Sequence, residues 1–296
     1  MKIAFIGFGE AARAFTATLR ESGATFSTYD IVTAIGREGD LRDAASRLGV
    51  TVAGSPEDAV VDADWVFSAV TAADSLQAGR SVASEIMEGQ VFFDINSVSA
   101  GRKQETARIV GARGAAYVDM AVMAPVHPHG HRTPVLIAGP HCSSVEATLS
   151  RLGFDFAIVG DDIGAATSIK MLRSLFVKGL EAVTVQTLLA ARAAGRFDEI
   201  HASLSGSFPQ LGWPEFPLYQ LDRVATHGVR RAAEMRESAT TLAELGFPTG
   251  AALADAIADL HQGVGTLGGG NGGDTDCSQA YDRILELMIR QAKAAE

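Results

Sequence analysis

The chain begins with Met1-Lys-Ile-Ala-Phe-Ile-Gly7-Phe-Gly9-Glu-Ala-Ala12, an apolar run that leads into a glycine-rich turn. The run is typical of a strand buried on both faces, and the turn is typical of the start of a helix. Gly7 permits a tight turn, Gly9 lets a pyrophosphate approach the backbone, and Ala12 lets the helix pack closely on the strand. The pattern favours a dinucleotide site over a glycine turn that binds nothing. Its expected contacts are Gly7, Phe8, Gly9, Glu10, Ala11 and Ala12.

A carboxylate ends the next predicted strand, Thr25-Phe-Ser-Thr-Tyr-Asp30. At this position of a dinucleotide site, a carboxylate accepts hydrogen bonds from a ribose diol and repels the 2′-phosphate of NADP. We therefore expect Asp30 to favour NAD as the cofactor. NADP is the alternative if Arg37 reaches back toward a 2′-phosphate, and a plain turn residue is the other interpretation of Asp30.

The composition is that of a globular protein with about two domains. The chain has 296 residues, of which 47% are hydrophobic and 20% charged, and its net charge is -10. This acidity argues against nucleic acid and membranes as partners, so local cations must hold any anionic substrate. Cys142 and Cys277 match no metal-binding spacing and indicate reduced thiols. Glycines interrupt the first apolar stretch and no unbroken run reaches about 18 apolar residues, so we expect a cytoplasmic protein.

Strands and helices alternate over residues 1–162, which predicts an α/β fold: a Rossmann domain with a doubly wound parallel sheet. Further strands are expected at residues 25–30, 51–53, 65–70, 91–95, 116–120, 135–138 and 154–159, with helices at 41–48, 55–61, 72–87, 102–112 and 144–152. Residues 163–296 predict an all-α domain, joined to the first by one long helix over 164–194. Its other helices are expected at 197–204, 218–245, 251–260 and 277–294, with an ordered turn at 208–217 and a flexible glycine-rich loop at 267–273.

Three polar residues lie four apart on the long predicted helix, namely Lys170, Ser174 and Lys178. This spacing places them on one helix face, among mostly apolar neighbours. Partial desolvation lowers the pKa of a lysine, which suits it to proton transfer near neutral pH. From the residues alone, two solvated surface lysines remain the simpler interpretation.

Taken together, these motifs resemble those of the β-hydroxyacid dehydrogenases related to 6-phosphogluconate dehydrogenase and 3-hydroxyisobutyrate dehydrogenase. The chain looks most similar to a bacterial subgroup with its own C-terminal helical domain, over essentially the whole length. The resemblance rests on Gly7-Phe-Gly9-Glu-Ala-Ala12, Asp94-Ile-Asn-Ser97-Val-Ser99, Asp119-Met-Ala-Val-Met-Ala-Pro125-Val, Gly164 with Lys170 and Ser174, and His227-Gly-Val-Arg230-Arg231-Ala-Ala-Glu234-Met235.

The resemblance implies roles for individual residues. The expected catalytic residues are Lys170, as the general acid and base, and Ser174, in place of an asparagine that orients the substrate. The expected cofactor contacts beyond the glycine turn and Asp30 are Val70, Thr71 and Asn96. The expected substrate contacts are Ser97, Val98, Ser99, Met123, Ala124, Pro125, His127 and Arg231. Family members associate through the helical domain, so a homodimer or a higher oligomer is expected.

Two departures from the family pattern concern the substrate. A serine at 174 is a shorter donor than asparagine, so its reach differs. Met123-Ala124-Pro125 replaces the usual Ser-Gly-Gly, which removes a hydroxyl and adds bulk. The resemblance therefore implies a pocket that accepts a different or more apolar substituent.

Two clusters keep alternative interpretations. The alternating histidines of His127-Pro-His129-Gly-His131 are spaced like metal ligands, but the proline and glycine predict a loop, and no carboxylate or cysteine within it completes a site. We therefore expect no metal and favour a loop near the substrate or the nicotinamide, with at least one histidine a plain surface residue. Arg230 and Arg231 can contact an anion, but pairing with Glu234 and Glu237 explains them equally well.

The resemblance implies a reversible oxidation of a β-hydroxy acid or a related anionic alcohol, with hydride transfer to NAD and proton transfer to Lys170. An imine or keto-acid reductase on the same scaffold is one alternative. A non-catalytic regulatory protein that binds a dinucleotide is another. Absorbance of reduced nicotinamide during a screen of hydroxy acids distinguishes them.

Overall fold

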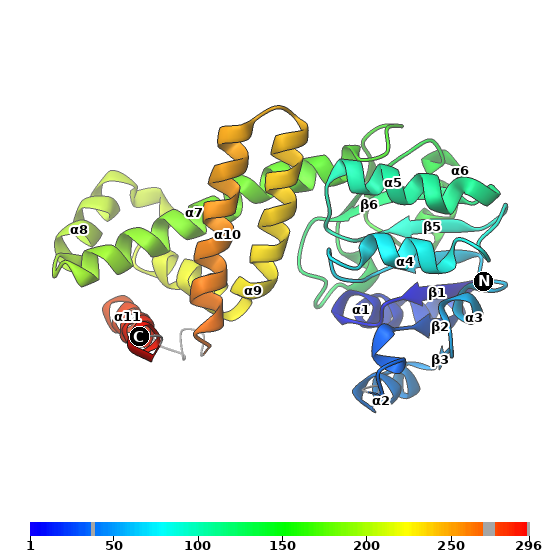
Figure 1. The fold of residues 1–296 in the computed structure, drawn as a ribbon, viewed down its shortest axis with the longest axis horizontal. Helices are drawn as coiled ribbons and strands as arrows, with labels where there is room; N and C mark the ends of the chain where they lie inside the picture. Colours follow the sequence, from blue (N-terminus) through cyan, green and yellow to red (C-terminus); the bar gives the residue numbers. More distant parts are fainter. Residues whose placement is uncertain (37–38, 269–275, 295–296) are drawn as a thin grey trace. The chain divides into compact units, whose positions relative to one another are not determined.

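The computed structural model describes residues 1–36, 39–268 and 276–294, and the chain forms two compact units, residues 1–171 and 172–296 (Figure 1). The sequence placed this division at 162/163, at the start of the long helix. The first turns of that helix instead belong to the first unit, because the N–H groups of Gly164 and Thr167 both donate to the Asp119 carboxylate in the sheet. Arg37 and most of the predicted loop at 267–273 lie outside the described residues.

One eight-stranded sheet forms the centre of the first unit, in the order β3-β2-β1-β4-β5-β6-β7-β8. The strands are β1 (Lys2–Ile6), β2 (Thr25–Tyr29), β3 (Val50–Val52), β4 (Trp65–Ser68), β5 (Val91–Asp94), β6 (Ala116–Val122), β7 (Val135–Ala138) and β8 (Phe156–Ile158). All neighbours are parallel except β6 and β7, which the sequence did not predict. The reason is the connection between them, which contains only the short 3₁₀ helix Gly130–Arg132 and no crossover α-helix.

Both faces of the sheet are buried, as the apolar run at the N-terminus predicted. Ile3 and Phe5 of β1 pack into the core under α1 (Glu10–Leu19), α2 (Gly39–Leu48) and α6 (Cys142–Leu152). Ala4 and Ile6 pack into the opposite core, under α3 (Pro56–Val60), α4 (Ser75–Val82) and α5 (Ala100–Val110). The strand order reverses between β1 and β4, and the carboxyl ends beside such a point are where doubly wound sheets bind ligands.

The second unit is helical, as predicted. Its helices are the greater part of α7 (Ala165–Ala193), α8 (Phe197–Ser207), α9 (Glu215–Glu244), α10 (Pro248–Thr266) and α11 (Cys277–Ala294). Helices α9 and α10 lie antiparallel and side by side (Figure 1). They approach closely because Gly228 faces α10: a Cβ there would lie 2.2 Å from the His261 carbonyl oxygen.

Helix ends differ from the predicted ones by a few residues. The predicted helix at 72–87 is only Ser75–Val82, whereas the one at 251–260 extends to Pro248–Thr266. The predicted turn at 208–217 contains the short 3₁₀ helix Pro209–Leu211 and the start of α9. Among the described residues, α7 is the one helix long and apolar enough to cross a membrane by length and composition, and half of the qualifying window is buried, as in a core helix.

Candidate functional site

The glycine turn lies between the ends of β1 and β4, at the point where the strand order reverses. Gly7 has a φ of +87°, and a Cβ there would lie 2.6 Å from the Ala69 carbonyl oxygen, so only glycine fits. Gly9 precedes α1, and no atom beyond its own residue and its two chain neighbours lies within 4 Å of where its Cβ would be. The space beside Gly9 is therefore open at the N-terminus of α1, where free N–H groups and the helix dipole favour a pyrophosphate.

The remaining predicted residues of the turn divide into exposed and buried ones. Glu10 is exposed and Ala11 half-buried, whereas Ala12 is buried under the sheet. The Phe8 side chain belongs to the core and is not available to a ligand. The Arg13 guanidinium donates through Nε to the Phe8 carbonyl and pairs with Asp40, which fixes the turn from outside.

Asp30 lies at the end of β2 and is held by two backbone donors. Its Oδ2 accepts from Phe8 N at 2.8 Å, and its Oδ1 accepts from Val32 N at 3.1 Å. Each carboxylate oxygen has a second lone pair, so the group can still accept hydrogen bonds from a diol. Asp30 is therefore fixed beside the glycine turn, where the sequence predicted the ribose contact.

The loops after β4 and β5 are joined by the buried Asn96 side chain. Its Oδ1 accepts from Val70 N and its Nδ2 donates to Ser68 Oγ, both at 2.8 Å. Thr71 is exposed, and its hydroxyl donates to Asp74. Of the three predicted cofactor contacts here, Val70 and Thr71 thus present atoms to the surface, whereas Asn96 holds the loop that carries Val70.

The Lys170 ammonium contacts the turn that follows β5. Its Nζ donates to Ser97 Oγ at 2.6 Å. One turn earlier on α7, Thr167 Oγ1 donates to the Val98 carbonyl at 2.5 Å. Val98 and Ser99 are buried, and the Ser99 hydroxyl caps α5 by accepting from Arg102 N. Ser97 is thus the residue of the predicted Ser97-Val98-Ser99 anchor that presents its hydroxyl to the half-buried Lys170.

The segment after β6 contains the other predicted substrate residues. Met123 is half-buried, whereas Ala124, Pro125 and His127 are exposed. His131 differs from them because it is buried: its ring nitrogens contact Thr18 Oγ1 at 2.7 Å and the Leu152 carbonyl at 2.9 Å. Burial lowers the pKa of His131. Within residues 1–36, 39–268 and 276–294, no three His, Cys, Asp or Glu side chains lie close enough to hold a metal ion.

In the helical unit, Ser174 and Lys178 are both buried. Lys178 Nζ donates to Ser174 Oγ at 3.1 Å and pairs with Glu234 at 2.9 Å. Burial lowers the pKa of Lys178, and Glu234 opposes the shift. Lys178 is therefore an internal ion-paired lysine, not a solvated one.

Arg231, a predicted substrate contact, is also internal to the helical unit. Its Nε and Nη2 both donate to the Glu181 carboxylate, and the two side chains are almost fully buried. Helical periodicity placed Arg231 on a polar stretch, but it could not show that α7 supplies a carboxylate opposite. His261 completes this cluster, 3.6 Å from Glu181, and burial lowers its pKa to about 4.

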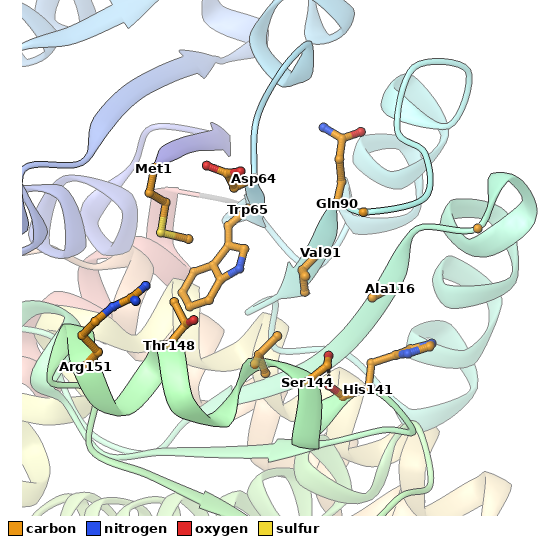
Figure 2. Close-up of a pocket in the computed structure, with 13 residues that line it drawn as sticks. Met1, Asp64, Trp65, Gln90, Val91, Ala116, His141, Ser144, Thr148 and Arg151 are labelled. Atoms are coloured by element: carbon orange, nitrogen blue, oxygen red, sulfur yellow. Dashed lines mark hydrogen bonds between the residues drawn. The ribbon is translucent and has the colours of Figure 1, made fainter.

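A surface cavity of about 530 Å³ lies elsewhere on the first unit. Figure 2 shows Met1, Trp65, Gln90, His141 and Arg151 around it. Met1 and Gln90 precede β1 and β5, so this cavity is at the amino ends of the strands. The glycine turn, Asp30 and Asn96 are at the carboxyl ends, where ligands of such sheets bind, so the cavity is separate from the predicted cofactor site.

Four buried ionisable residues near Ser97 were given no role by the sequence: Asp94, Lys103, Tyr117 and Asp119. Asp94 and Asp119 belong to motifs that carried the resemblance, but α5 reads as a polar surface helix, so nothing local marks Lys103. The signal that could have found it is the pairing of two carboxylates in neighbouring strands.

Comparison with known sequences and structures gives the chain its relatives. Residues 2–97 match the family described as NADP oxidoreductase, coenzyme F420-dependent, and residues 191–264 match a domain of unknown function, DUF1932. A conserved hypothetical protein from Sinorhizobium meliloti 1021 is 32% identical, with a TM-score of 0.75 over 98% of this chain and 96% of its own.

Two further structures connect the chain with hydroxyacid dehydrogenases. A conserved protein of unknown function, MTH1747, whose structure was described as similar to 3-hydroxyacid dehydrogenases, is 28% identical, with a TM-score of 0.69 over 89% of this chain and 98% of its own. A Mycobacterium tuberculosis 3-hydroxyisobutyrate dehydrogenase with L-serine is 16% identical, with a TM-score of 0.69 over 96% and 98%. At that identity the likeness concerns the fold alone, as it does for imine reductases.

The comparisons and the glycine turn both indicate an oxidoreductase that binds a nicotinamide dinucleotide. The N-terminal match is to an NADP oxidoreductase domain, and the structure from Sinorhizobium meliloti 1021 is similar over almost the whole of this chain. The chain therefore resembles the β-hydroxyacid dehydrogenases and has an NAD(P)-binding oxidoreductase fold.

Proposed function

We propose that this protein is an NAD-dependent dehydrogenase that reversibly oxidises a β-hydroxy acid or a related small anionic alcohol, with Lys170 as the general acid and base. The observation that carries the proposal is the contact between Lys170 Nζ and Ser97 Oγ at 2.6 Å. It joins the first turns of α7 to the loop that also carries Asn96, beside the predicted cofactor site. A titratable ammonium next to a hydroxyl, at the carboxyl ends of a doubly wound sheet, suits proton transfer to and from an alcohol.

The residues at the carboxyl ends fit a dinucleotide. Gly9 leaves open the space beside the N-terminus of α1, which suits the pyrophosphate, and Asp30 suits the adenosine ribose. A bound nicotinamide would supply the hydride acceptor. Asp30 supports NAD over NADP, because its carboxylate would repel a 2′-phosphate.

The chain's own part in the reaction is to move a proton and to orient the alcohol. In the oxidation, neutral Lys170 accepts the hydroxyl proton at Nζ while the carbinol C–H hydrogen leaves with its electron pair. In the reduction, the ammonium returns the proton to the carbonyl oxygen. Because Ser97 Oγ accepts a hydrogen bond from the Lys170 ammonium, its own O–H remains to donate to the substrate.

The test is a spectrophotometric screen with the purified full chain. NAD is supplied with a panel of β-hydroxy acids, and α-hydroxy acids and uncharged alcohols of matched size serve as controls. We expect reduced nicotinamide to accumulate with one or more β-hydroxy acids. Turnover in the reductive direction with imines only would favour the reductase. The screen is repeated with NADP and with a deazaflavin in place of NAD. Binding of NADH without turnover of any compound under any of these conditions would favour a regulatory protein.

A further inference from the structure

Four ionisable side chains are buried together beneath the Ser97 turn, and the proposed reaction uses none of them. Asp94, Lys103 and Asp119 are fully buried, and Tyr117 is 2% exposed. Asp94 and Asp119 are partners in register across the parallel strands β5 and β6. Two carboxylates side by side in a protein interior repel each other, and they require a cation between them to remain charged.

Lys103 of α5 supplies that cation. Its Nζ lies 3.1 Å from Asp94 Oδ1 and 3.3 Å from Asp119 Oδ1, and it also donates to the Asp94 carbonyl at 2.5 Å. Tyr117 donates its hydroxyl to Asp94 Oδ2 at 2.8 Å and remains neutral, because burial and the two carboxylates raise its pKa. The cluster of these four residues thus carries two negative charges and one positive charge.

The start of α7 offsets the remaining negative charge. Asp119 Oδ2 accepts from Gly164 N and Thr167 N, both at 3.1 Å, which is the usual way a carboxylate stabilises a helix N-terminus. Gly164 is required there, since its φ is +103° and a Cβ would lie 2.7 Å from the Ala100 Cβ. The first turn of α7 is therefore fixed on the sheet, and Lys170 follows one turn later.

Asp94 fixes the other partner of Lys170. Its Oδ1 accepts from Asn96 N at 3.0 Å, which sets the course of the backbone into Ser97. Lys103 therefore contacts both carboxylates: Asp94, which holds the Ser97 turn, and Asp119, which holds the start of α7. A side chain that only filled the core would not need an ammonium at this point.

We infer that Lys103 is a positioning residue, which sets the separation between the Lys170 ammonium and the Ser97 hydroxyl by holding Asp94 and Asp119 in place. The inference rests on the proposed role of Lys170. It goes beyond that role because it assigns a function to a fully buried lysine that touches neither substrate nor cofactor. Removal of its charge should change the environment of Lys170 without changing the glycine turn.

Three variants and one control test this inference. Lys103→Met removes the ammonium and leaves two unpaired carboxylates, so it can fail to fold. Asp119→Asn is the milder variant: the amide oxygen can still accept from Gly164 N and Thr167 N, but the ion pair with Lys103 is lost. Lys103→Met combined with Asp119→Asn restores the wild-type excess of one negative charge. Lys293→Met, the same change at an exposed position on α11, is the matched control.

The first readout needs no substrate. Trace acetylation with acetic anhydride over a pH series, followed by mass spectrometry of the Lys170 peptide, reports the pKa and reactivity of that amine. Asp119→Asn and the double variant should shift the Lys170 profile by about half a pH unit or more, while fluorescence titration with NADH gives a Kd within about twofold of wild type. Lys293→Met should leave both unchanged.

The second readout uses the substrate found in the screen. Misplacement of a reacting group by about 1 Å costs about 10²-fold in rate, so kcat should fall about 10- to 100-fold with KM within about threefold. Folded variants with an unchanged Lys170 profile would overturn the inference and leave Lys103 a structural cross-link. If the wild type turns over no alcohol but the Lys170 profile still shifts, the proposed function fails and the positioning does not.

Discussion

Replacement of Lys170 and of Lys178 by methionine should separate the proton-transfer residue from its neighbour. Methionine keeps the stem length and removes the ammonium. The two lysines are eight residues apart on α7, roughly 12 Å at 1.5 Å per residue, so only one of them can reach a given hydroxyl. Lys170 contacts Ser97 at 2.6 Å, whereas Lys178 is committed to Ser174 and Glu234.

For Lys170→Met we expect kcat to fall by about 10²- to 10⁴-fold, the usual contribution of a general acid and base. Folding and the NADH Kd should be retained, because the residue lies outside the glycine turn. Lys178→Met should lower kcat less than about tenfold and act on stability instead. Loss of a buried charged hydrogen bond costs about 1–3 kcal/mol.

Steady-state kinetics on the substrate, with thermal melts and NADH titrations of each variant, measures both effects. The role of Lys170 as the proton-transfer residue is refuted if Lys170→Met retains more than about a tenth of the wild-type kcat. It is refuted equally if the loss of activity in Lys170→Met follows unfolding in the melt, or if Lys178→Met is the more damaging change to kcat.

Three further predictions follow from single residues or surfaces. Asp30 should give NAD at least a tenfold advantage over NADP in kcat/KM, and a tenfold preference for NADP would show that another group governs the pocket. His261 is neutral in the folded protein, because burial lowers its pKa from 6.5 to about 4. Its contribution to the free energy of unfolding is therefore fully present above about pH 6.5 and is lost as the pH falls toward 4. The shift corresponds to a loss of about 3 kcal/mol in the free energy of unfolding. Urea unfolding at pH 7 and pH 4.5 should show a smaller drop in this free energy for His261→Gln than for the wild type. Finally, Leu172, Phe176 and Val183 of α7 are 43%, 73% and 63% exposed, which supports a homodimer or a larger assembly. Phe176→Asp should weaken that assembly. A mass of 31.0 kDa by light scattering at micromolar concentration would contradict it.

The parts of the fold that local sequence could predict are those fixed by one short stretch. Ile3 to Ile6 alternate between two cores, so an uninterrupted apolar run was the correct signal for a central strand. The tight turn at Gly7 could be predicted because its backbone conformation and its closeness to Ala69 require a glycine, which the sequence shows directly. Asp30 could be placed because the second strand ends there, beside the first.

Features that depend on a distant partner could not be predicted in the same way. Apolar periodicity carries no strand direction, so the antiparallel pairing of β7 with β6 was missed. The polar stretch around Arg231 gave no sign that Glu181, fifty residues earlier, faces it across the helical unit. For the same reason the burial of Lys178 was not decided by its helical spacing.

The buried cluster at Lys103 shows which long-range feature a sequence can still reveal. Asp94 and Asp119 each lie in a predicted strand, and the two strands follow one another in a parallel sheet, so the two carboxylates could be expected side by side. Such a pair is unstable in a protein interior without a cation. Lys103 lies on the helix that connects those strands, and at 0% exposure it is the cation that this pairing requires. Two aspartates in neighbouring buried strands therefore predict a buried lysine or arginine on the helix that connects them. The same logic makes the Ser97 turn and the start of α7 one rigid support, because each is bound to one of the two carboxylates that Lys103 joins.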